Sequence, residues 1–99
     1  MRVALVTGGG SGIGRSAALE LNKIDFTVYV VGRREEELIK TSSLATNNNH
    51  KIIPIKTDIT IGSQVIALFD KIKSDHGRID LLFNNAGVGA PRVPIEDLK

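Results

Sequence analysis

A glycine-rich stretch near the N-terminus, residues 7–14, has the composition of an anion-binding turn. It reads Thr-Gly-Gly-Gly-Ser-Gly-Ile-Gly, follows an apolar run at residues 3–6, and precedes a segment whose apolar residues recur at helical spacing. Glycines permit positive φ angles and let a backbone approach a ligand closely. The N-terminus of the following helix would add unpaired N–H groups and positive dipole charge. The order of strand, glycine turn and helix therefore predicts a site for the phosphates of a nucleotide.

Two general phosphate-binding patterns fit this stretch. Residues 9–16 differ by one residue from the P-loop of nucleoside triphosphatases, because Arg15 stands where that loop has a lysine. In addition, the best candidate strand for a magnesium-binding aspartate ends in Asn84 and Asn85 instead. Residues 12–17 fit the fingerprint of dinucleotide-binding folds, with alanine in the last place. The spacing favours a dinucleotide.

Residues 7–14 and a second motif, Asn-Asn-Ala-Gly at residues 84–87, together resemble the short-chain dehydrogenase/reductase family. The first motif is similar to the family's cofactor loop and the second to its signature at the end of the fourth strand. Either motif alone also fits an ordinary turn or strand exit. The resemblance covers residue 3 to about residue 98. It implies that the cofactor is bound by Thr7, Gly8, Gly10, Ser11, Gly12, Ile13, Gly14, Asn85, Ala86 and Gly87.

The fold that this resemblance implies is α/β, a partial Rossmann-like doubly wound parallel sheet with four strands in the order 3-2-1-4 and three helices. Apolar patterning places the strands at about 3–6, 26–31, 52–56 and 78–83. Pro54 cannot donate to a ladder, which puts the third strand at an edge. In this order both motifs meet where the strand order reverses, between the first and fourth strands.

The same patterning places two helices at about 12–23 and 35–46. A third helix would begin at Thr60, a candidate N-cap, and end at His76 and Gly77. The second helix has only a weak apolar face and is expected to lie largely exposed. Leu38 and Ala45 are expected to form this face, with a contribution from Ile39 and Leu44.

The end of the second strand favours NADP over NAD. The closing position is Gly32, which has no carboxylate to repel a 2′-phosphate, and the guanidinium groups of Arg33 and Arg34 follow, able to bind a phosphate bidentately. The alternative is that both arginines pair with the glutamates at residues 35–37.

Two further polar segments are candidates for the same site. Residues 57–60 resemble the family's short acidic motif, in which the side chain of Asp58 or the N–H of Ile59 contacts the adenine. Asp58 fits a turn or a helix cap equally well. Of Asn84 and Asn85, one can tie neighbouring strand ends together while the other addresses a ribose or a backbone amide.

Composition fits one small domain, residues 1–99, with 41% hydrophobic residues. The net charge of +2 comes from 13 basic and 11 acidic residues without a basic stripe, so we expect neither nucleic acid nor a membrane as partner. The absence of cysteine excludes disulfides and thiolate metal sites. Because strand-like sequence begins at Val3 and no apolar run approaches membrane-spanning length, the expected location is the cytoplasm.

The acid/base chemistry that the resemblance implies has no counterpart in this sequence. It uses a tyrosine, a lysine four residues later and a serine. The sequence has one tyrosine, Tyr29, and the residue four positions later is Arg33 instead of a lysine. The apolar neighbours of Tyr29 place it in a core strand. We therefore expect no catalytic residue and no turnover. The chain is interpreted as the cofactor-binding N-terminal half of an NADP-dependent oxidoreductase acting on an alcohol or carbonyl, with the catalytic and oligomer-forming parts absent. The alternative is a genuine short product that binds a nucleotide without catalysis.

Overall fold

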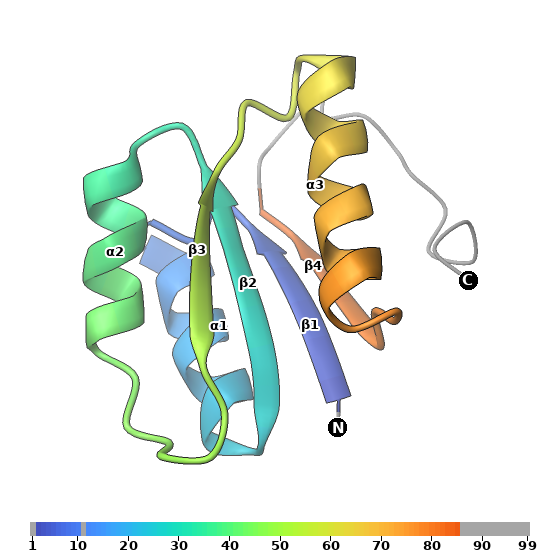
Figure 1. Cartoon of the computed structure of the whole chain (residues 1–99). Helices are drawn as coiled ribbons and strands as arrows, with labels where there is room; N and C mark the ends of the chain where they lie inside the picture. Colours follow the sequence, from blue (N-terminus) through green and yellow to red (C-terminus); the bar gives the residue numbers. More distant parts are fainter. Residues whose placement is uncertain (1, 11, 86–99) are drawn as a thin grey trace.

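The computed structural model describes residues 2–10 and 12–85, in which a parallel sheet lies between two layers of helices (Figure 1). The strands are β1 (Arg2–Thr7), β2 (Phe26–Gly32), β3 (Ile52–Lys56) and β4 (Leu81–Asn84), and the helices are α1 (Gly12–Lys23), α2 (Glu35–Ser43) and α3 (Gly62–Asp75). The strand order is β3-β2-β1-β4, and each neighbouring pair is parallel. The predicted partial Rossmann-like fold is confirmed.

Alternate residues of the central strands face two separate apolar layers. Helices α1 and α2 cover one face of the sheet and α3 covers the other (Figure 1). The face under α3 contains Val3, Leu5, Tyr29 and Val31 with Leu68 and Ile72. The opposite face contains Ala4, Val6, Val28 and Val30 with Ala18 and Leu38. Burial on both faces explains why β1 and β2 have unbroken apolar sequences.

Strand β3 forms one edge of the sheet, as its proline predicts. Pro54 lies opposite Val30 in the parallel pairing with β2, and β3 has no second neighbour among the described strands. The missing N–H of the proline therefore leaves no central ladder position unpaired.

Helix α2 ends at Ser43, three residues before the predicted limit. Its buried residues are Leu38 and Thr41, whereas Ile39 and Leu44 are exposed, so the expected contribution of these two to the apolar face was wrong. A threonine lies in that face because its hydroxyl has a backbone partner opposite, the carbonyl of Gly9.

The start of α3 differs from the prediction, because the residue at the N-cap position is Ile61 and not Thr60. The hydroxyl and the N–H of Thr60 both donate to Asp58 Oδ1, at 2.6 and 3.0 Å. This local turn occupies the side chain that would otherwise cap the helix.

Strand β4 is shorter than predicted, since residues 78–80 lie outside it. The carboxylate of Asp80 accepts the N–H of Val3 at 2.7 Å and also binds Arg78. A side chain thus takes a backbone donor of β1 that a longer β4 would have paired.

Candidate functional site

The carboxyl ends of β1, β2 and β4 border a cleft of about 710 Å³ that the first turn of α2 and the turn after β3 complete. It lies where the strand order reverses, the usual ligand position in an open α/β sheet. The residues that line it are Gly8, Gly10, Val31, Gly32, Arg33, Arg34, Glu37, Leu38, Thr57, Asp58, Ile59, Thr60 and Asn85.

Gly8 and Gly14 are required in the glycine turn for different reasons. Gly8 has a φ of +64°, a conformation that side-chain-bearing residues rarely adopt. At Gly14 the reason is space, because a Cβ there would lie 2.0 Å from the carbonyl oxygen of Gly8. The first turn of α1 therefore lies directly against the backbone of Gly8, a residue that lines the cleft.

Thr7 joins β1 to β4 beside this turn. Its hydroxyl donates to Asn84 Oδ1 at 3.0 Å and accepts the N–H of Asn85 at 2.8 Å. The residue is only 7% exposed. The side chain of Thr7 therefore positions the strand ends, and Asn84 is the asparagine that ties them together.

Asn85 brings the second motif against the first. A Cβ on Gly8 or Gly14 would lie 3.3 or 3.1 Å from Asn85 Nδ2, so the side-chain amide is in contact distance of the glycine turn. The expectation that the two motifs converge is confirmed by this geometry.

Arg33 and Arg34 line the cleft beyond the end of β2. Within residues 2–10 and 12–85 neither forms an ion pair with the glutamates of the first turn of α2, and the ion pair of Glu37 is with Arg15. The two guanidinium groups remain available to an anion in the cleft.

Asp58 and Ile59 also line the cleft, from the turn after β3. The hydrogen bonds from Thr60 hold the pKa of Asp58 below its ordinary value, and the charge of Arg33 lowers this pKa further. Asp58 thus has the turn role that its sequence allows, and its contact with an adenine stays a prediction.

Two other predicted residues, Gly12 and Ile13, lie in the first turn of α1. Ile13 is 69% exposed in the first turn of α1, and a Cβ on Gly12 would meet no atom within 4 Å. Ser11, Ala86 and Gly87 lie outside the described residues.

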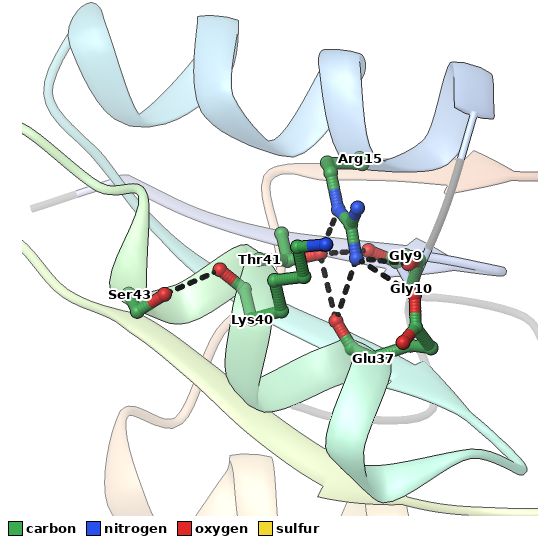
Figure 2. A network of polar contacts seen from close by, with 7 residues as sticks. All are labelled: Gly9, Gly10, Arg15, Glu37, Lys40, Thr41 and Ser43. Carbon is green, nitrogen blue, oxygen red and sulfur yellow. Dashed lines mark hydrogen bonds and ion pairs between the residues drawn. The ribbon is translucent and has the colours of Figure 1, made fainter.

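Sequence reasoning missed a polar network behind the glycine turn (Figure 2). Arg15 of α1 donates to the carbonyl of Gly10, to the carbonyl of Glu37 at 3.0 Å and to Thr41 Oγ1 at 2.8 Å. The Thr41 hydroxyl donates in turn to the carbonyl of Gly9 at 2.7 Å. Arg15 is therefore bound to backbone carbonyls, unlike the phosphate-binding lysine of a P-loop. The sequence signal for this network is the position of Thr41, which follows Leu38 by three residues and so lies on the same face of α2.

The cleft lining, as far as residues 2–10 and 12–85 form it, contains no tyrosine, lysine or serine. Tyr29 is fully buried under α3, where its hydroxyl donates to Asp75 at 3.1 Å and lies 2.6 Å from His76 Nδ1. Burial, followed by the carboxylate of Asp75, raises its pKa above the ordinary value. Its predicted place in the core is confirmed.

Within the part of the chain that the structure describes, no three acidic, histidine or cysteine side chains lie close enough to bind a metal ion. The helices found there are also too short or too polar to cross a bilayer.

Comparison with known proteins finds relatives along the whole chain. Residues 2–99 match the family model described as short chain dehydrogenase. The chain is 37% identical over 92 residues to short-chain dehydrogenase/reductase VdtF of Byssochlamys spectabilis, covering 93% of this chain and 30% of that protein. It is 34% identical over 99 residues to the short-chain dehydrogenase/reductase homolog YusS of Bacillus subtilis, covering 99% of this chain and 90% of that protein.

Solved structures give the same result. A metagenomic short-chain oxidoreductase in complex with NADP superimposes with a TM-score of 0.82 and 30% identity, over 88% of this chain and 39% of that one. Menthone neomenthol reductase from Mentha piperita superimposes with a TM-score of 0.79 and 32% identity, over 88% of this chain and 32% of that one. The chain thus spans about a third of the length of VdtF and of these two enzymes, and most of the length of YusS.

Proposed function

The chain belongs to the short-chain dehydrogenase family, and from this premise we propose that it is the cofactor-binding part of an NADP-dependent oxidoreductase. The proposed substrate of the whole enzyme is an alcohol or a carbonyl compound. When bound, the cofactor would exchange a hydride with the substrate, because NADPH can give one to a carbonyl and NADP⁺ can take one from an alcohol. The residues of the cleft would bind and orient it.

The glycine turn fits the diphosphate of a dinucleotide. A Cβ at Gly14 would collide with the carbonyl of Gly8, so the start of α1 packs against a residue that lines the cleft. N–H groups at the start of a helix bind phosphate well. We assign the diphosphate to residues 8–14, including Ser11, Gly12 and Ile13.

The two ends of the cleft fit the two nucleosides. Arg33 and Arg34 would bind the 2′-phosphate of the adenosine ribose, and the turn of Asp58 and Ile59 would contact the adenine. Asn85, with Ala86 and Gly87, would lie along the nicotinamide half, and Thr7 would hold Asn85 in place.

The observation that carries the NADP assignment is a pair of cleft-lining arginines that follow the glycine at the end of β2 and form no ion pair with the described glutamates. A bound 2′-phosphate has close to two negative charges, and a guanidinium binds it through two parallel hydrogen bonds. The relative bound to NADP has a superimposable fold.

The chain alone is proposed to bind the cofactor without turnover. Its single tyrosine is buried away from the cleft, so this stretch offers no proton donor of the family's kind. We infer that the catalytic residues lie in another part of the enzyme. The near-equal length of YusS supports a second candidate, a short nucleotide-binding protein without catalysis.

Isothermal titration calorimetry of the 99-residue chain with NADP and with NAD tests the proposal. We expect NADP to bind at least about tenfold more tightly, and Arg33→Ala to remove about tenfold of NADP affinity while changing NAD affinity less than about twofold. Lys51→Ala is the control, because Lys51 precedes β3 at the opposite end of the sheet. Equal binding of both cofactors, or unchanged preference in Arg33→Ala, would contradict the assignment.

A panel of aldehydes and ketones with NADPH tests the absence of turnover. We expect no substrate-dependent loss of NADPH absorbance with the homogeneous chain. Carbonyl reduction by this chain would refute the division into binding and catalytic parts.

A further inference from the structure

Arg15 connects three parts of the molecule behind the cleft. It extends from α1 to the glycine turn and to α2 (Figure 2). Its side chain is 19% exposed, and its partners are the carbonyl of Gly10, the hydroxyl of Thr41 and both the carbonyl and the carboxylate of Glu37. No phosphate-binding role is needed to account for these contacts.

Glu37 is the partner with a consequence for the cleft. It lines the cleft together with Arg33 and Arg34, and its carboxylate lies 3.4 Å from Arg15 Nη2. The other carboxylate in the lining, Asp58, already accepts two hydrogen bonds from Thr60. Without Arg15, the carboxylate of Glu37 would have lost the one ion-pair partner that the described residues give it.

We propose that Arg15 sets the preference for NADP by neutralising Glu37 and holding it against the glycine turn. This inference rests on the proposed NADP function. A carboxylate near the arginines would repel a 2′-phosphate and would compete for the same guanidinium groups. Paired with Arg15, Glu37 does neither, so Arg15 acts as a positioning residue.

The contacts of Arg15 have two effects, and a comparison of NADP binding with NAD binding distinguishes them. Its hydrogen bonds to the turn position the backbone that binds the diphosphate, which NADP and NAD share. Its charge on Glu37 concerns the 2′-phosphate, which only NADP has. Loss of the first lowers both affinities equally, and loss of the second lowers the ratio of NADP affinity to NAD affinity.

Calorimetric titration of a small set of variants with NADP and NAD measures that ratio. Arg15→Met removes the charge and the hydrogen bonds, and we expect the ratio to fall by about five- to tenfold. Arg15→Lys keeps the charge without the planar fork, so both affinities should fall while the ratio stays within about twofold of the wild type. Lys40→Met is the matched control, since it removes a positive charge from α2 that forms no ion pair within the described residues.

A double-mutant cycle with Glu37→Gln identifies the route of the effect. If Arg15 acts through Glu37, Glu37→Gln raises the ratio by about fivefold or more in the Arg15→Met background and by less than about twofold in the wild type. If Arg15 acts directly on the cofactor, the two increases are equal, which overturns the inference.

Circular dichroism establishes that each variant is folded. Should Arg15→Met be unfolded, Arg15→Gln replaces it with the same expectations, because it keeps a donor for the turn. Suppose that the wild type prefers NADP and Arg33→Ala does not. An unchanged ratio of NADP affinity to NAD affinity in Arg15→Met, or in Arg15→Gln, then refutes this inference and leaves the proposed function standing. A wild type without preference refutes the proposed function and this inference with it.

Discussion

Substitution of Gly14 by alanine should damage the cofactor turn more than any other change of one methyl group described here. The added Cβ would lie 2.0 Å from the carbonyl oxygen of Gly8 and 2.7 Å from its carbonyl carbon. Non-bonded contacts have their minimum near 3.5 Å, so the start of α1 and the turn must separate by more than about 1 Å. The atoms that collide are backbone atoms, which cannot rotate away as a flexible side chain can.

Two quantities follow from this displacement. Overpacking of this kind costs about 1–3 kcal/mol of unfolding free energy, and a shift of about 1 Å in a positioned binding group can cost about a hundredfold in function. We therefore expect Gly14→Ala to lower the free energy of unfolding by about 2 kcal/mol and the NADP affinity by about a hundredfold. Urea denaturation followed by circular dichroism gives the first value, and calorimetric titration at a temperature where the variant is folded gives the second.

Two other glycines provide matched controls. Gly62 begins α3, where a Cβ would meet no atom within 4 Å, so Gly62→Ala should change stability by less than about 0.5 kcal/mol. Gly12 also has open space but a φ of +57°, so Gly12→Ala should cost about 1–2 kcal/mol through backbone strain alone. If Gly14→Ala is as stable as Gly62→Ala and binds NADP as the wild type does, the packing argument for the turn is wrong.

Three further predictions concern residues that support the site. Tyr29→Phe should cost about 1 kcal/mol, because it removes the buried hydroxyl's hydrogen bonds to the end of α3. The raised pKa of Tyr29 means that its contribution to stability is complete below its ordinary pKa of about 10 and is lost as pH rises above it, so wild-type stability should fall more steeply in alkali than that of the variant. Asp80→Asn should weaken the contact with the N–H of Val3. Because the pKa of Asp80 is lowered in the folded protein, the wild type should lose this stabilisation as pH falls below about 4. The unfolding free energy of the variant should therefore depend less steeply on pH in acid. Thr7→Val removes the acceptor of the Asn85 N–H and should cost about 1 kcal/mol together with a severalfold loss of NADP affinity. Urea denaturation across pH and titration with NADP check these values, and flat, parallel pH profiles of variant and wild type would contradict the two pH predictions.

The strands and the position of the site could be predicted because their signals are local. An unbroken apolar run rich in β-branched residues, such as residues 28–31, is typical of a strand buried on both faces, and Pro54 argues against a central position for β3. The order of the strands then followed from the resemblance of residues 7–14 and 84–87 to a known family. Together they placed Asn85 beside the glycine turn, where the structure has it.

The polar network could not be predicted because its partners are distant in sequence. Thr41 is fully buried, although a threonine near the end of a short helix usually lies on the surface, since the carbonyl of Gly9, 32 residues earlier, accepts its hydrogen bond. For the same reason β4 begins late, at Leu81, because Asp80 binds the N–H of Val3. The periodicity of a segment contains no information about such partners.

The prediction of Thr60 as the N-cap of α3 was wrong for a local reason. Both Thr60 and Asp58 are good capping and turn residues, and the sequence does not say which of them satisfies the other. In the structure Asp58 accepts both hydrogen bonds, which leaves Ile61 at the start of the helix.

The pairing of β1 with β4 also bears on how the chain folds. The hydrogen bond between Val3 and Asp80 joins residues 77 apart, whereas β1 and β2 pair across a single helix. Closing the longer loop costs more chain entropy, so β4 should join a sheet that β1, β2 and β3 have already formed. Asn85 arrives with β4, and the wall of the cleft next to the glycine turn is the last to be built. A dinucleotide that contacts this wall would draw the folding equilibrium toward the fully paired sheet.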